Sequence, residues 1–377
     1  MINFTKALYT DLLAKIQKMV HKIESGKHHD DIKGDFVNDT IESLKILEHK
    51  ITGIIVSGDL EIDFLLANNL SNYSDLNQNL EYIELFRLQP IKNYGSGDHY
   101  FKVLVEKIYD DSNILSTPPL VSTISNSDNY YWAVPFENII AIPFWEEESL
   151  INVPDIYHEI GHLIFVQYRS ILAGKFIPVL NDYFKLELSY AVDERRINDF
   201  EILEATLEYW KASWFEEFVC DLIATFLTGS AFAWTNMKLT TISHSKAQVY
   251  HYQPSHPADE ARTQAIIKML KIMENDEESE EIFNSWKSFE ELINYPKRPC
   301  YDIIFSNDIL DKLTMIVYDF CNDIDINIYI ENTGDAPKTI AQYLNDIWYV
   351  SRHKSEDFAE LEKFTIGQIK EQLKIED

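Results

Sequence analysis

The sequence predicts a predominantly helical α+β fold, with a small antiparallel sheet flanked by helical regions. Through most of the chain apolar residues recur every three or four positions, the period of an amphipathic helix, as at Leu8, Leu12 and Ile16. Residues 121–145 differ, because they are rich in β-branched and aromatic residues and carry a turn-forming cluster at 126–129. This contrast predicts one hairpin or short sheet in a helical protein.

Changes in composition divide the chain into three expected regions. The paired prolines at 118 and 119 end the first helical pattern, and the acidic run at 274–281 is a candidate second boundary. Isoleucines that alternate with polar residues at 324–330 predict a short strand near the end of the chain. We expect an N-terminal helical region, a central core and a C-terminal, mostly helical region, at 1–112, 113–272 and 273–377.

Charge and cysteine content argue against several classes of protein. The chain has 33 Lys and Arg against 62 Asp and Glu, a formal charge of -29, so its field repels nucleic acid phosphates and anionic lipid. Its three cysteines show no paired spacing, which is typical of a reducing compartment. No run approaches the roughly 18 uncharged apolar residues of a membrane span. We expect a cytoplasmic protein that neither binds nucleic acid nor inserts into a membrane.

A metal-binding motif lies on an expected helix in the central region. This helix begins near Pro154, with Asn152 or Asp155 as its N-cap, and contains the pentapeptide H-E-I-G-H. The motif places His158 and His162 one turn apart on one face, so that both imidazoles can bind a single metal ion. Zinc (Zn2+) is the expected metal, because it accepts imidazole and carboxylate ligands and has no redox chemistry.

The neighbour of the first histidine, Glu159, is the expected catalytic base. It projects toward the same cleft and could take a proton from a metal-bound water, as metal-assisted amide hydrolysis requires. The alternative to a metal site is a helix that carries the two histidines and binds no metal.

The third metal ligand is expected on a second long helix, from about Phe200 to Thr228. It ends at Gly229, which lacks a Cβ atom and suits a left-handed backbone. Within it Glu217 and Asp221 stack on one face among aromatic residues, so a metal would satisfy Glu217 and a ligand histidine would satisfy Asp221. Glu216 is the rival ligand, and the alternative to both is an acidic strip that faces solvent.

Together these motifs resemble a known family. H-E-x-x-H followed by E-x-x-x-D is similar to the zinc metallopeptidases of the gluzincin type. With the later H-P-x-x-x-x-R element, His256 to Arg262, the order looks like the family of the HtpX heat-shock protease and the CaaX prenyl endopeptidases. The resemblance covers Pro154 to Arg262 and implies a zincin-like catalytic core, with the active-site helix next to the sheet and Glu217 as a zinc ligand. The better-known members are membrane proteins, so their substrates do not carry over to this chain.

The resemblance also implies that His256 or Arg262 shapes the substrate or oxyanion pocket. Either cation could stabilise the charge that develops on a tetrahedral oxyanion. Alternatively, His256 only ends a loop and Arg262 pairs with Asp259 or Glu260. Tyr252 is a further donor that could reach the pocket.

The sequence therefore predicts a zinc-dependent metallopeptidase that acts on a peptide or protein substrate. The strand at 138–143 is expected at the edge of the cleft, where an extended peptide could add as another strand. The flanking helical regions are expected to restrict access and make the enzyme selective or regulated, with a regulatory protein partner as one route. The alternatives are a non-catalytic metal-binding protein that acts through partners and a zinc hydrolase of non-peptide amides or esters.

Overall fold

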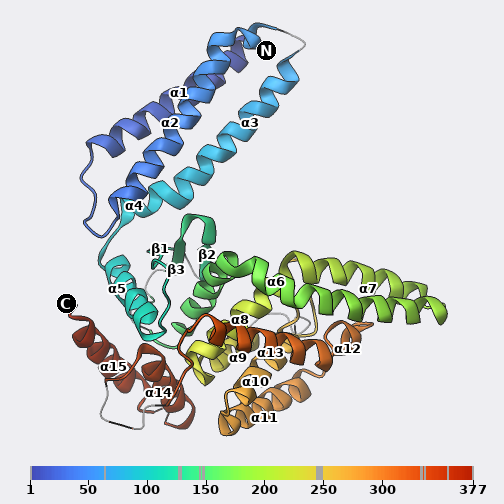
Figure 1. Ribbon diagram of the computed structural model, residues 1–377. Helices are drawn as coiled ribbons and strands as arrows, with labels where there is room; N and C mark the ends of the chain where they lie inside the picture. Colours follow the sequence, from blue (N-terminus) through green and yellow to red (C-terminus); the bar gives the residue numbers. More distant parts are fainter. Residues whose placement is uncertain are drawn as a thin grey trace.

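The protein is mostly helical, with one three-stranded sheet (Figure 1). The computed structural model describes residues 2–375 apart from 63, 64, 126–129, 144, 145, 147, 148, 243–248, 332, 333, 335, 336 and 355. The helices are α1 (Ile2–Ser25), α2 (Gly34–Ser57), α3 (Leu66–Ile83), α4 (Gln89–Asn93), α5 (Ser96–Asp111), α6 (Pro154–Asp193), α7 (Ile197–Tyr209), α8 (Phe215–Thr228), α9 (Ser230–Ile242), α10 (Asp259–Ile272), α11 (Asp276–Ile293), α12 (Tyr301–Ile304), α13 (Asn307–Asp323), α14 (Ile340–His353) and α15 (Phe358–Leu373).

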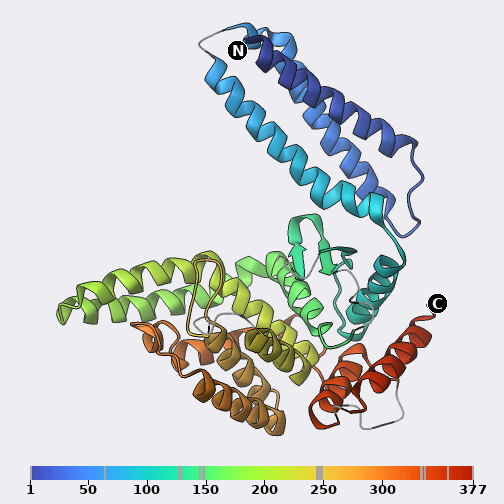
Figure 2. The same ribbon diagram turned by 180° about the vertical axis from the view of Figure 1, so that it is seen from behind.

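Helices α1 to α4 form an N-terminal arm that projects from the rest of the chain in both views (Figures 1 and 2). The arm has a hydrophobic core of its own, in which side chains such as Leu12, Leu44 and Leu80 are buried. Helix α5 lies outside this core, because its apolar face packs with the sheet and the main core. The two cores therefore separate between Ile91 and Tyr100, ahead of the expected boundary at residue 112.

The sheet is mixed, so the expectation of an antiparallel sheet is wrong. Its strand order is β1-β3-β2: β1 runs parallel to β3, and β2 runs antiparallel to β3. The reason lies in β3, whose five residues are all buried and therefore take the centre of the sheet. The expected turn at 126–129 lies outside the described residues. The strands are β1 (Leu120–Ser125), β2 (Trp132–Val134) and β3 (Ile139–Pro143).

Helix α6 is longer than the sequence pattern indicates. It has 40 residues and continues through Pro178. Apolar side chains at every fourth position, Leu172, Phe176, Leu180 and Phe184, are fully buried and hold the extension in the main core. The N-cap is Val153, with no side-chain cap, so the expected capping by Asn152 or Asp155 is wrong. Asp155 instead accepts a hydrogen bond from the Tyr130 hydroxyl, at 2.6 Å.

Among the described residues, α6 alone has the length and mean hydropathy of a membrane span. Its most apolar stretch has a mean hydropathy of 1.4, and 28% of that stretch is buried. One such helix is weak support for a membrane location, because the core helix of a soluble protein meets the same criteria. The expectation of a cytoplasmic protein without membrane insertion stays a prediction.

The expected second long helix is present, with one interruption. A π-helical turn at Trp210–Trp214 joins α7 to α8. At the end of α8, Gly229 has a φ of +63°, the positive value for which glycine is suited. A Cβ atom there would lie 2.4 Å from the ring of Tyr329. Glycine is therefore required at position 229 both by the positive φ and by the nearby ring of Tyr329.

The C-terminal helices share the main core with the central region. Residues of α11, α13 and α14 are buried in the same cluster as α6 and α8. Most of the acidic run, residues 276–281, forms the first turns of α11. Residues 324–330 form no strand, so that expectation is wrong: Asn327 and Tyr329 donate their backbone N–H groups to Ser112 and Phe226 at the ends of helices.

Candidate metal centre

A glycine brings the two long helices of the core into close contact. A Cβ atom on Gly161 of α6 would lie 2.8 Å from the Cα atom of Cys220 on α8, and 3.1 Å from its carbonyl oxygen. These are backbone atoms that cannot rotate away, so only glycine fits at this crossing. The contact places the H-E-I-G-H turn of α6 opposite the first turns of α8.

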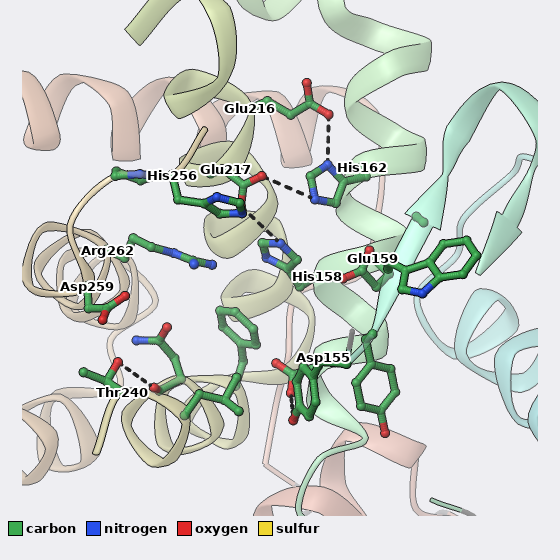
Figure 3. Close-up of a pocket in the computed structure, with 18 of the residues that line it drawn as sticks. Asp155, His158, Glu159, His162, Glu216, Glu217, Thr240, His256, Asp259 and Arg262 are labelled. Atoms are coloured by element: carbon green, nitrogen blue, oxygen red, sulfur yellow. Dashed lines mark hydrogen bonds and ion pairs between the residues drawn. The ribbon is translucent and has the colours of Figure 1, made fainter. Parts of the chain in front are cut away.

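At this crossing His158, His162 and Glu217 form a group that could hold a metal ion. One ligand atom from each residue lies within 4.8 Å of the other two. His158 Nε2 lies 3.6 Å from one carboxylate oxygen of Glu217, and His162 Nε2 lies 3.8 Å from the other. Figure 3 shows the two imidazoles and the carboxylate directed toward one another. The metal identity is not fixed by this geometry.

The other ring nitrogen of each histidine faces a carboxylate. His158 Nδ1 lies 2.9 Å from Asp221 Oδ1, and His162 Nδ1 lies 2.9 Å from Glu216 Oε1. A carboxylate at Nδ1 keeps the proton on that nitrogen, so the lone pair of Nε2 is free to face Glu217. As expected, Asp221 faces a histidine of the motif, His158. Glu216, the rival candidate for the third metal ligand, contacts the other histidine, His162.

Arg262 holds the Asp221 carboxylate in place. Its Nε and Nη2 atoms donate to the two oxygens of Asp221 at 2.7 and 2.6 Å, a bidentate pair. Asp221 is fully buried. Burial alone would raise the pKa of Asp221. The Arg262 guanidinium and His158 instead hold this pKa down at about 2. Arg262 was expected either to shape the oxyanion pocket or to pair with Asp259 or Glu260. Its ion pair is instead with Asp221.

Glu159 lies beside the metal-binding group and is 6% exposed. Burial raises its pKa, and the neighbouring imidazoles of His158 and His162 oppose this shift. The backbone of Ala133, in β2, lies beside the Glu159 carboxylate and also lowers its pKa. Glu159 thus lies between the metal-binding group and the sheet.

The group opens into a cleft of about 640 Å³, drawn in Figure 3. Trp132 and Ala133 of β2 line it on one side. The expectation that the strand at 138–143 forms the cleft edge is wrong, because β3 is the central strand and β2 is the outer one. The other lining side chains come from α6, α8, α9, α10, residues 251–257, and the residues on either side of β2, namely Tyr130, Tyr131 and Pro135.

The segment that carries His256 is fastened to the π-helical turn before α8. Trp214 Nε1 donates to the Gln253 carbonyl at 2.8 Å, and Ser213 Oγ donates to the Pro254 carbonyl at 2.5 Å. His256 is exposed and lines the cleft, with Nδ1 at 3.0 Å from Ser255 Oγ. Tyr252 does not line the cleft; its ring packs against Trp214, with centroids 5.3 Å apart.

Three residues of the cleft were not expected as functional residues. Phe232, on α9, stacks on the His158 ring at 6.0 Å between centroids. Asp155 lies one turn before Glu159, an i, i+4 spacing that could have indicated a shared face. Asp259 lies between Pro257 and Arg262, both of which also line the cleft. No pattern in the sequence points to Phe232.

Comparisons with protein-family models, with curated proteins and with solved structures found no match to this chain. The resemblance to the HtpX and CaaX prenyl endopeptidase family therefore stays a prediction, supported by the motifs alone.

Proposed function

We propose that this chain is a zinc-dependent metallopeptidase with a zincin-like core, in which His158, His162 and Glu217 bind the metal and Glu159 is the general base. One observation carries the proposal: two imidazole nitrogens and a carboxylate converge on one point while a buried carboxylate lies next to them. A metal site that is only structural needs the ligands and has no use for Glu159. A non-catalytic role is therefore less favoured.

The ligand set fits zinc. Two imidazoles and one carboxylate leave a fourth tetrahedral position open, as catalytic zinc sites do. Carboxylates behind both rings are typical of such sites. When bound, zinc would supply Lewis acidity that polarises the scissile carbonyl and lowers the pKa of a water molecule.

The side chains around the group have separable roles in this proposal. Glu159 takes a proton from the attacking water and later gives it to the leaving amine. The backbone of Ala133, beside Glu159, lowers the pKa of that carboxylate. His256, at the mouth of the cleft, is the proposed donor to the developing oxyanion. Arg262 acts through Asp221 and orients His158.

An extended peptide is the substrate that the cleft suits best. Strand β2 pairs only with β3 in the described sheet, and its residues Trp132 and Ala133 line the cleft. A peptide could pair with this strand through its main chain and lie across the metal-binding group. This arrangement favours peptides over small amides or esters.

The N-terminal arm supports the proposal of a selective or regulated enzyme. Phe86, at the base of the arm, packs on Trp132 with ring centroids 5.5 Å apart. Arg87 pairs with Glu137, which lies in the turn between β2 and β3. The arm thus contacts the outer strand next to the cleft, and a partner that binds the arm could change the shape of the cleft.

The test is metal analysis and peptidase assay of the wild type beside Glu159→Gln and Glu217→Ala, with labelled casein and a peptide pool as substrates. We expect Glu159→Gln to keep one zinc per chain and lose on the order of 1,000-fold in turnover. Glu217→Ala should lose zinc at concentrations that saturate the wild type. Glu208→Gln, an exposed change on α7, is the matched control. Full activity of Glu159→Gln would overturn the proposal.

A further inference from the structure

A second cavity lies at the base of the N-terminal arm, the end that joins α5 (Figure 1). It is a groove of about 680 Å³ between two parts of the arm. One wall is the end of α1 with the residues that follow it, and the other is the π-helical turn Glu84–Leu88 with α4. No residue lines both this groove and the metal-binding cleft, so the groove is a separate feature of the surface.

The floor of the groove is apolar. Ile23 and Ile91 line it and are buried in the core of the arm. Met19 and Leu88 also line it, and they are half-buried. These side chains leave part of their apolar surface in contact with water, which burial under a ligand would remove. The floor therefore favours a ligand with an apolar face.

The rim of the groove is basic. Its lysines, Lys22, Lys27 and Lys92, are all exposed, and none forms an ion pair with an acid among the described residues. The carboxylate that lines the groove belongs to Glu84, which pairs with Lys15 at 3.0 Å. Three uncompensated positive charges thus surround an apolar floor, in a chain whose formal charge is -29. This charge favours a ligand that carries carboxylates.

The π-helical turn that forms one wall also reaches the metal-binding cleft. Glu84 and Leu88 of this turn line the groove, whereas Phe86 packs on Trp132, which lines the cleft. Turns of this type are rare in helices and are frequent at functional sites. A ligand in the groove would therefore contact the same short segment that touches the outer strand of the sheet.

We propose that this groove binds an acidic amphipathic helix of a partner protein. The apolar face of the helix lies on the floor, and its carboxylates pair with Lys22, Lys27 and Lys92, as in other helix-in-groove complexes. Charge complementarity selects this occupant. A short segment meets only the groove, because charges beyond about 8–10 Å are screened, whereas a second copy of this chain or an anionic membrane would face the whole negative surface. The inference goes beyond the peptidase activity, because it concerns binding to the arm.

The test is fluorescence anisotropy of the full chain with a labelled model helix of about 18 residues that has leucine on one face and glutamate on the other. A second peptide has lysine in place of glutamate, and a third has alanine in place of leucine. We expect the acidic leucine peptide to bind at least about 10-fold more tightly than either of the others. Lys22→Glu/Lys92→Glu should weaken its binding roughly 10-fold. Lys50→Glu/Lys185→Glu, an equal change of charge at exposed lysines outside the groove, is the control and should leave the affinity within about twofold.

Equal binding of the acidic and basic peptides, wild-type affinity in Lys22→Glu/Lys92→Glu, or no binding of the acidic peptide would overturn the proposal. Two further measurements test other occupants of the groove. A wild-type dimer in sedimentation velocity, or retention of the protein on phosphatidylserine vesicles, would overturn it if Lys22→Glu/Lys92→Glu abolished the effect. None of these measurements depends on turnover, so an inactive protein that binds the acidic peptide would refute the peptidase proposal alone.

Discussion

Substitution of Gly161 by Ala should separate α6 from α8 at the metal centre. The added Cβ would lie 2.8 Å from Cys220 Cα, roughly an ångström closer than an ordinary van der Waals contact, and the atom it meets is backbone. Overpacking of this kind costs about 1–3 kcal/mol, and alanine returns about 1 kcal/mol of helix propensity. We expect a net loss of up to about 2 kcal/mol in the free energy of unfolding.

The same shift should weaken metal binding, because it moves Glu217 on α8 away from the histidines on α6. We expect zinc affinity to fall about 10-fold or more. Urea denaturation of the metal-free protein measures the first effect, and competition with a chelator measures the second. Gly174→Ala is the matched control, since that glycine lies on α6 with nothing within 4 Å of its added Cβ, and it should stabilise the protein by up to about 1 kcal/mol. Wild-type stability and zinc affinity in Gly161→Ala would refute the reasoning.

Two further substitutions test the contacts behind the site. Asp221→Asn should lower zinc affinity about 10- to 100-fold and destabilise the protein by on the order of 3 kcal/mol, because Arg262 loses its buried counter-charge. Glu216→Gln should have smaller effects on both quantities, since the Glu216 side chain is 28% exposed. Equal effects of the two substitutions would contradict this ranking. Gly229→Ala should cost about 2 kcal/mol, because it adds a clash with Tyr329 to an unfavourable φ. In thermal denaturation, the double variant Gly229→Ala/Tyr329→Ala should recover only the part of the lost stability that is due to the clash. A double variant whose loss equals the sum of the two single losses would argue against the contact.

The sequence predicts the parts of the site that depend on local spacing. His158 and His162 meet because they lie one turn apart on a helix, and Asp221 faces the metal site because it lies one turn after Glu217. The long helices that carry these residues follow from the same helical period. Local spacing is sufficient wherever one regular element sets the geometry.

Contacts that depend on tertiary structure were not accessible to such patterns. Arg262 binds Asp221 across 41 positions of sequence, and no local rule distinguishes this partner from the nearer acids. The position of β3 between its neighbours depends on which strand is buried on both faces. Asp155 fits a capping pattern, yet the Tyr130 hydroxyl takes its carboxylate, a partner that only the fold brings near.

X-ray absorption at the zinc edge of the metal-loaded protein tests the central claim most directly. The account predicts a first shell of two imidazole nitrogens at about 2.0–2.1 Å and light oxygen ligands, with no sulfur. A sulfur scatterer near 2.3 Å, or a shell without imidazole, would contradict binding by His158, His162 and Glu217.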